Sequence, residues 1–316
     1  MPRAALVPLM VLGGALVALQ SRVNGALADE IGTGLRAAAL AAVVSFGCGL
    51  AIITAFVVST PAGRRSLRRL THARHIGRLR WYETLGGLGG AFFVASQGLA
   101  VGTVGLALFI VAFTAGQSLS SLVVDHTGLG PGNAQPASAG RIVAASCAIA
   151  AVLLKSVDRL DAGATWTTVG LALVAFGAGT AQAVQQALNG RVSRAAGAPA
   201  TTWNNFIVGT TALLALLAVS FLADGHVKRL PDAGWHYLGG LLGIGFIVIA
   251  AIAVRTYGVL VLGLCMIAGQ VVTAEIIDIA DPAVRTGPLG LLGGAVALAG
   301  ALTALALSHI RDTLDR

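Results

Sequence analysis

The feature that most constrains this chain is a series of ten apolar segments, each close to the length of a membrane-spanning helix. A transmembrane helix needs about 20 consecutive, mostly apolar residues to cross the hydrocarbon core of a bilayer. In a chain of 316 residues, ten such segments leave little sequence for any other kind of structure. The expected helices are roughly 4–26, 36–58, 83–101, 104–124, 139–154, 164–188, 199–222, 235–254, 257–279 and 287–308. The sequence therefore predicts an all-α integral membrane protein with ten transmembrane helices.

The composition excludes a soluble globular protein. Hydrophobic residues make up 56% of the chain and charged residues only 11%, and the mean hydropathy is +0.84. A soluble domain usually has about 25% charged residues. Because so few polar side chains are available to cover the surface, lipid must replace water around most of the molecule, and the bilayer is an expected partner.

The net charge of +8 is concentrated in one short connection. Seven arginines lie between the second and third expected helices: Arg64, Arg65, Arg68, Arg69, Arg74, Arg78 and Arg80. They lack interleaved aromatic residues and any recognition-helix or zinc pattern, so a nucleic acid is not an expected partner. A polybasic loop beside a membrane span is typical of a topology signal, and lipid head-group binding is the alternative.

The distribution of positive charge predicts the orientation. If the Arg-rich loop is cytoplasmic, 14 of the 21 Lys and Arg residues fall on that side. The fourteen are Arg3, the seven loop arginines, Arg141, Arg191, Arg194, Arg255, Arg311 and Arg316. Cytoplasmic loops carry the excess of positive residues, so both the N- and the C-terminus are expected in the cytoplasm.

An internal repeat divides the chain into two halves. The run Leu85–Gly90 resembles Leu238–Gly243, Gly116-Gln117 resembles Gly269-Gln270, and Asp125 matches Asp278. All three matches have an offset of 153 residues. Fixed-period similarity is the mark of a repeat architecture, and the predicted repeats are residues 1–158 and 159–316, with five helices each.

Earlier parts of the two halves match at slightly different offsets. Gln20-x-x-x-Asn24 pairs with Gln185-x-x-x-Asn189 at 165 residues, and Phe46-x-x-Gly49 pairs with Phe206-x-x-Gly209 at 160. Because each repeat has an odd number of spans, the second begins on the opposite side of the membrane. Inverted repeats of this kind are typical of secondary transporters, which bind substrate near the midplane.

Buried amides are the candidate substrate-binding residues. Polar side chains at bilayer depth are costly and usually face the bundle interior or a cavity. The candidates are a stripe on the sixth helix (Gln182, Gln185, Gln186 and Asn189), a shorter stripe on the first helix (Gln20 and Asn24), the mid-helix pair Gln117 and Gln270, and Gln97, which has no matching amide in the second half. A neutral amide both donates and accepts hydrogen bonds, which suits a polar, uncharged substrate. Hydrogen bonding between helices is the alternative role.

Three acidic residues are candidates for coupling transport to protons. Glu275 lies deepest in an expected span and has no acidic counterpart, because the repeat pairs it with Leu122. Asp125 and Asp278 lie at the ends of the fourth and ninth helices, where an ordinary head-group position is the alternative.

No sequence motif indicates an enzyme, a metal site or a cofactor. HExxH, GxSxG and the phosphate-binding loop are absent, and the three cysteines, Cys48, Cys147 and Cys265, have no CxxC spacing. Small-xxx-small glycine spacing, as in Gly86-x-x-x-Gly90, also permits a homodimer.

Taken together, these motifs resemble the YdcZ-like family of bacterial inner-membrane proteins in the drug/metabolite transporter (DMT) superfamily. The resemblance runs over nearly the whole chain through Gln20-x-x-x-Asn24, Ser45-Phe46-x-x-Gly49, Gly116-Gln117, Gln185-x-x-x-Asn189, Asn205-Phe206-x-x-Gly209 and Gly269-Gln270. It implies the EamA-like arrangement of ten helices, cytoplasmic termini, an inner-membrane location and an exporter role. The expected function is secondary transport of small metabolites or amphipathic compounds, with proton coupling left open. The alternative is a non-transporting scaffold or lipid-binding assembly protein.

Overall fold

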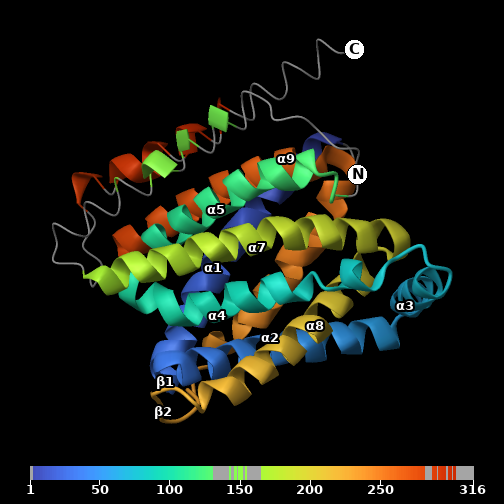
Figure 1. Cartoon of the computed structure of the whole chain (residues 1–316), viewed down its shortest axis with the longest axis horizontal. Coiled ribbons are helices and arrows are strands. Elements are labelled where there is room, and N and C mark those ends of the chain that lie inside the picture. Colours follow the sequence, from blue (N-terminus) through green and yellow to red (C-terminus); the bar gives the residue numbers. More distant parts are fainter. Residues whose placement is uncertain are drawn as a thin grey trace.

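The computed structural model describes residues 3–130 and 165–281, together with short pieces within 142–154 and 287–303. Helices dominate these residues, and most of them lie side by side in one bundle (Figure 1). In chain order the elements are α1 (Arg3–Ile31), β1 (Gly32–Thr33), α2 (Gly34–Ser59), α3 (Pro61–His75), η1 (Trp81–Thr84), α4 (Gly87–Val104), α5 (Leu106–His126), α7 (Trp166–Ala196), α8 (Ala198–Ser220), β2 (Gly225–Val227), η2 (Gly234–Leu238) and α9 (Gly239–Ala280).

Within the described residues, seven helical segments are long and apolar enough to cross a membrane. They agree in place with the first four expected helices and with the sixth, seventh and eighth. α1 and α7 continue past their expected ends to Ile31 and Ala196, where Leu27, Ile31 and Ala196 are buried against neighbouring elements. Half of the expected helix 139–154 and parts of the expected helix 287–308, including its last five residues, lie outside the described residues.

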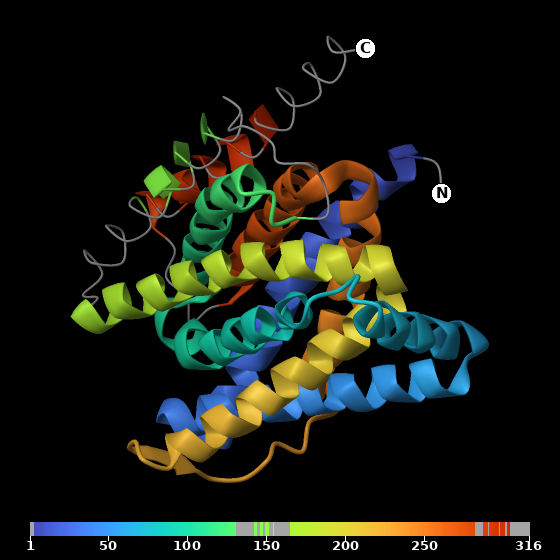
Figure 2. The ribbon, with the colours of Figure 1, turned by 45° about the vertical axis from the view of Figure 1, so that its right-hand side comes forward.

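The helix α9 reverses direction within its 42 residues. A Cβ built on Gly13 of α1 would lie 2.8 Å from Met266 and 3.2 Å from Ile249, both on α9. In a straight helix with a rise of about 1.5 Å per residue, two residues this far apart in sequence would be about 25 Å apart. α9 therefore has two limbs that both pack on α1, and the turn between them is visible in the orange part of the chain (Figure 2). The limbs correspond to the separate expected spans 235–254 and 257–279.

The Arg-rich connection forms the amphipathic helix α3 rather than a loop. Its buried residues follow one another at intervals of three or four positions, about one helical turn: Gly63, Ser66, Leu70 and Ala73. Leu70 and Ala73 pack against Val192, Ala196 and Ala200 at the α7–α8 junction. The Ser66 hydroxyl donates to the Ala196 carbonyl (2.6 Å) and accepts from the Ala200 N–H (3.0 Å). These contacts hold α3 on the bundle and turn most of its arginines toward solvent.

A small two-stranded sheet joins connections that are far apart in sequence. β1, which follows α1, pairs antiparallel with β2, which follows α8, with Gly32 opposite Val227 and Thr33 opposite His226. The Lys228 N–H also donates to the Ile31 carbonyl (2.7 Å). This sheet and α3 lie at opposite ends of α2 (Figure 1).

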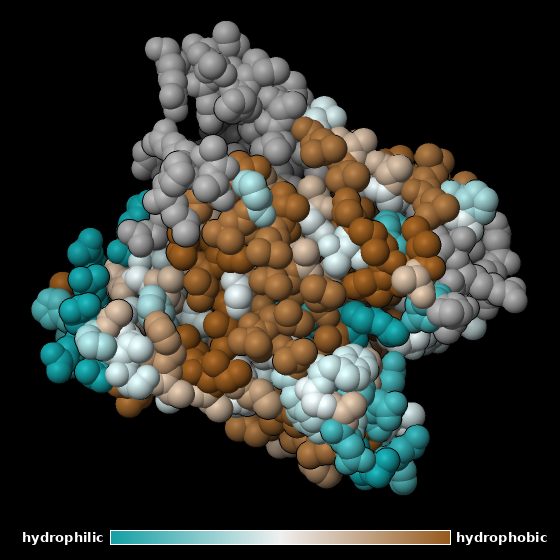
Figure 3. Space-filling view, turned by 180° about the vertical axis from the view of Figure 1, so that it is seen from behind, coloured by the Kyte–Doolittle hydropathy of each residue, from teal (hydrophilic) through white to brown (hydrophobic). Residues whose placement is uncertain are grey.

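The surface between these two ends is apolar. Figure 3 shows a broad hydrophobic face with hydrophilic residues gathered at its margins. Large apolar side chains exposed along the helices include Leu12, Phe56, Val123 and Leu173. Such a belt matches the hydrocarbon core of a bilayer, and the polar ends match its two interfaces.

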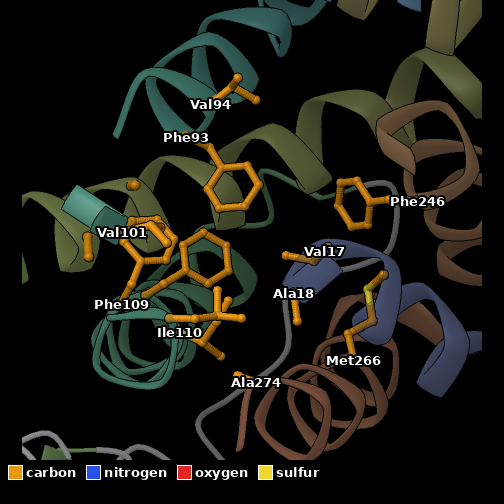
Figure 4. Close-up of a cluster of buried hydrophobic side chains, with 14 of the residues drawn as sticks. Val17, Ala18, Phe93, Val94, Val101, Phe109, Ile110, Phe246, Met266 and Ala274 are labelled. Carbon is orange, nitrogen blue, oxygen red and sulfur yellow. The ribbon is translucent and has the colours of Figure 1, made fainter. Parts of the chain in front are cut away.

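The core brings together side chains from α1, α4, α5 and α9. Phe93 of α4 contacts Phe113 of α5 with ring centroids 4.7 Å apart and planes inclined at 36°, and the Phe109 ring lies 6.3 Å from that of Phe93. Figure 4 shows Phe93 and Phe246 projecting into one cluster with Val17 and Ala18 of α1. The polar side chains described below lie among these apolar residues in the middle of the bundle.

Candidate functional site

The polar stripe of α7 is buried over its whole length. Gln182, Gln185, Gln186 and Asn189 are each less than 10% exposed. Gln185 Nε2 and Asn189 Nδ2 both donate to Oδ1 of Asn205 on α8, at 3.1 and 3.0 Å. Asn205 was not among the predicted site residues, although it occurs in the Asn205-Phe206-x-x-Gly209 motif. Half of the stripe thus joins α7 to α8.

The stripe of α1 is joined to α4 in a comparable way. Asn24 Nδ2 donates to Gln97 Oε1 (2.6 Å), and Gln97 Nε2 donates to the Ser21 hydroxyl (2.8 Å). Gln97 is fully buried. Both ends of its amide are occupied, so Gln97 holds two helices together.

Asparagine and glutamine side chains in both stripes lie directly on glycines of a facing helix. Asn24 abuts Gly239, Gln20 abuts Gly243, and Asn189 abuts Gly86. A Cβ at Gly239 or Gly86 would overlap the asparagine amide. These contacts explain why glycine-rich sequence lies at the start of α4 and α9.

Other amides are buried without a hydrogen-bond partner. In Gln117 and Gln182, both the nitrogen and the oxygen of the side-chain amide lack a hydrogen-bond partner. A single amide atom also lacks a partner in Gln270 (Oε1), Gln185 (Oε1) and Gln186 (Nε2). A buried polar group left unpaired costs about 1–3 kcal/mol. Water or a ligand therefore has an energetic reason to enter beside these side chains.

A cavity of about 10 Å³ lies where α7 faces both limbs of α9. Its lining combines the amides Gln185, Gln186 and Asn189 with apolar residues that include Phe246, Ala250 and Leu262. A water molecule needs roughly 10–15 Å³ measured in this way. In this conformation the cavity has room for about one water, so a larger molecule requires the helices to move apart.

The acidic candidates have different surroundings. The Asp278 carboxylate is 2% exposed and accepts from the Ala107 N–H at the start of α5 (2.8 Å), where a carboxylate stabilises the first helical turn. Glu275 is partly exposed as a residue, but its Oε2 atom is buried and its carboxylate lies against Gly294. The side chain of Asp125 lies outside the described residues.

An ion pair lies at the end of the bundle that carries α3. The Arg191 guanidinium of α7 donates to the Glu83 carboxylate, to the Leu129 carbonyl (2.7 Å) and to the Gly128 carbonyl (2.8 Å). Glu83 also accepts from the Arg80 N–H (2.7 Å). Beside this pair is an open pocket of about 230 Å³ lined by Arg78, Arg194 and Gly130, among others. Glu83 and Arg191 therefore connect η1, the end of α5 and α7.

A family model described as "Putative inner membrane exporter, YdcZ" matches residues 5–154 and 170–303. This chain belongs to the YdcZ family. The matched residues include the polar stripes of both halves and every candidate site residue predicted from the sequence. The family is defined as one of membrane exporters of the DMT type, which is not a class of enzymes.

A solved structure supports the fold of this YdcZ-family chain. One crystal structure of a protein is 20% identical in sequence and has a TM-score of 0.58, covering 96% of this chain and 98% of that chain. At this level of identity the likeness concerns the fold alone. No curated protein has a matching sequence.

The predicted site residues of the YdcZ-family chain thus fall into two groups. Asn24, Gln97 and Asn189 donate hydrogen bonds to neighbouring helices, which is the alternative role considered for such amides. Gln117, Gln182, Gln186 and Gln270 have at least one buried amide atom without a partner. Gln185, Asn24 and Asn189 each have one paired and one unpaired amide atom and belong to both groups.

Proposed function

We propose that the chain is a secondary transporter that exports small neutral or weakly charged compounds through a polar centre between two inverted five-helix repeats. The repeats are residues 1–158 and 159–316. The observation that carries the proposal is a set of buried amide atoms without partners: both atoms of Gln117 and Gln182, and Oε1 of Gln270. A purely structural bundle gains nothing from these groups, whereas a transported molecule can pair with them.

Matched contacts between helices support the inverted repeat. Gly116 packs on the Phe176 carbonyl, and Gly269 packs on the Val11 carbonyl. The two glycines are 153 residues apart and their two partners are 165 apart, which are the offsets found in the sequence. Asn24 on Gly239 and Asn189 on Gly86 follow the same two offsets. A pseudo-two-fold relation between the halves accounts for both pairs of contacts.

The consequence for mechanism is alternating access. Two halves with equivalent packing can exchange conformations, so that an opening on one side of the membrane has a counterpart on the other. The small cavity beside α7 then belongs to a closed state. Glu275 is our candidate for coupling this exchange to protons, since intramembrane carboxylates are typical of proton pathways.

Flux measurements on glutamine variants test the proposal. Reconstituted Gln117→Leu and Gln270→Leu should insert and fold normally but lose transport in a proteoliposome screen of metabolites and dyes, with and without a pH gradient. Val123→Leu, at a lipid-facing position of α5 that is 62% exposed, is the control. Normal flux in the glutamine variants would remove these residues from the site.

The orientation can be tested separately. We place both termini and α3 in the cytoplasm and the β1–β2 sheet on the other face. In a cysteine-free background, His72→Cys on α3 should react with a membrane-impermeant thiol reagent only from inside, and Lys228→Cys only from outside. Labelling of both positions from one side would overturn the topology.

A lipid-binding assembly role is the second candidate function. The observation in its favour is the exposed polar face of α3 with its arginines, since basic residues at a membrane surface attract anionic head groups. Wild-type protein that moves no compound in the screen but binds anionic vesicles through α3 would favour this role.

A further inference from the structure

The two halves differ at the centre of the bundle in one respect that bears on the substrate. At the repeat offsets, Gln97 of the first half corresponds to Ala250 of the second, and Ser21 corresponds to Gln186. The first half therefore has a long amide on α4 and a small hydroxyl on α1. The second half has the long amide on α7 and only a methyl group on α9.

In the first half the long amide has a hydrogen-bond partner at both of its polar atoms. The Gln97 amide accepts from Asn24 and donates to Ser21. On the same helix, Phe93 packs against Phe109 and Phe113 of α5. Both polar atoms of the Gln97 amide are thus paired, although Asn24 Oδ1 has no partner.

In the second half the arrangement is incomplete. Phe246 corresponds to Phe93, but Leu262 and Met266 stand where Phe109 and Phe113 would be expected from the repeat. Phe246, Ala250 and Leu262 all line the small cavity beside α7. Smaller side chains at 250 and 262 explain why the cavity lies in this half.

The residues that line the cavity carry one unpaired donor and two unpaired acceptors. Gln186 Nε2, Gln185 Oε1 and Asn189 Oδ1 have no hydrogen-bond partner, and all three residues line the cavity. These residues are 5%, 3% and 7% exposed. The lining carries no charged residue, so an ionic group would be placed there without compensation.

We propose that the substrate is anchored on one side only, in the cavity between α7 and α9, by a neutral group that both donates and accepts hydrogen bonds, namely a carboxamide or a hydroxyl. This group takes the place in the second half that the Gln97 amide takes in the first. The proposal rests on the proposed transport function and adds the chemical class of the substrate. Since the cavity has room for about one water, the rest of the substrate lies in space that opens between the limbs of α9 and α7.

Three probes of similar shape test the hydrogen-bonding requirement. Purified wild-type protein is heated with isobutyramide, isobutyrate or methyl isopropyl ketone, and the unfolding temperature is followed by tryptophan fluorescence. Isobutyramide should raise this temperature in a saturable manner because a ligand that binds the folded state stabilises it. The anion and the ketone, which lacks a donor, should give half-saturation at concentrations about tenfold higher or more, the equivalent of roughly one hydrogen bond.

Variants that fill the cavity test whether isobutyramide binds there. Ala250→Gln introduces the amide found in the first half and should remove the response to isobutyramide. Its unfolding temperature without ligand should exceed that of Ala250→Leu, which fills the same space without hydrogen bonds. Leu262→Phe restores the aromatic residue of the first half and should also remove the response, so the test survives if one variant fails to fold.

Two outcomes would overturn the inference. One is an equal response of the wild type to all three probes, or none to isobutyramide, which is the result expected if the cavity holds a water only. The other is an unchanged isobutyramide response in Ala250→Gln and Leu262→Phe. Failure of this inference is separable from failure of the transport function: flux lost in Gln117→Leu but retained in Ala250→Gln would leave a transporter whose substrate binds elsewhere.

Discussion

The rings of Phe46 on α2 and Phe206 on α8 are in contact, with centroids 4.9 Å apart and planes inclined at 46°. Each ring also lies on a glycine of the other helix: Phe206 on Gly49 and Phe46 on Gly209. The contact is reciprocal, so each aromatic residue depends on the absence of a side chain opposite. α2 and α8 can approach closely only because both positions are glycine.

Alanine at either glycine should therefore destabilise the protein. In Gly49→Ala the new methyl group would overlap the Phe206 ring, and in Gly209→Ala it would overlap the Phe46 ring. Overpacking of this kind typically costs about 1–3 kcal/mol. Thermal unfolding in detergent should show a lower midpoint for both variants. Gly47→Ala is the control, because no atom lies within 4 Å of its Cβ position, and an equal loss in Gly47→Ala would contradict this explanation.

Replacement of Arg191 should weaken the end of the bundle near α3. Lysine keeps the charge but cannot reproduce the planar set of donors that reaches Glu83, Leu129 and Gly128. We expect Arg191→Lys to lose about 1–3 kcal/mol of unfolding free energy, since carbonyls of a partly buried loop lose their donor. Arg194→Lys, at an exposed position beside the same pocket, is the matched control. Equal stability of the two variants would show that the guanidinium geometry is unimportant.

Two glutamine-to-leucine changes should differ in their effect on stability and on transport. Gln97→Leu leaves the buried Asn24 Nδ2 without its acceptor and removes the donor to the Ser21 hydroxyl, which keeps its bond to the Val17 carbonyl, so the unfolding temperature should fall. Gln182→Leu removes two amide atoms that have no partner, so stability should be unchanged or higher while transport falls. The measurements are thermal unfolding and flux on the same preparations. A stable Gln97→Leu together with an unstable Gln182→Leu would reverse the roles assigned to these amides.

The acidic residues can be separated by conservative amide substitutions. Asp278→Asn retains an acceptor for the Ala107 N–H and should preserve folding, whereas Asp278→Ala should cost about 0.5–2 kcal/mol, as loss of a helix N-terminal acceptor does. Glu275→Gln should fold normally but lose the response of flux to an imposed pH gradient. Flux in Glu275→Gln that still follows the gradient would exclude Glu275 as the coupling group.

The parts of the fold that could be predicted from sequence are those with a strong apolar pattern. The spans of α2 and α8 end within two residues of their expected limits, because uninterrupted apolar runs end at polar turns. α3 was missed because its buried face consists of Gly63, Ser66, Leu70 and Ala73, which include too few large apolar residues to stand out among arginines. Its packing partners come from the distant α7–α8 junction, which no local pattern reveals.

For the candidate site, sequence identified the residue types but not their partners. Gln97 and Gln117 look alike in sequence, since each is an amide within an apolar helix. Gln97 lies within hydrogen-bonding distance of Asn24 and Ser21, whereas Gln117 has no partner. This difference depends on how separate helices meet, so only tertiary structure can distinguish an amide that joins helices from one left open to a ligand.

The pairing of β1 with β2 also limits how the bundle can move. Backbone hydrogen bonds tie the chain just after α1 to the chain just after α8, although nearly two hundred residues separate them. Splaying these two helix ends apart would break the ladder, so they must travel as a unit. Any gate at that face therefore has to form between this linked pair and other helices, rather than between its two members.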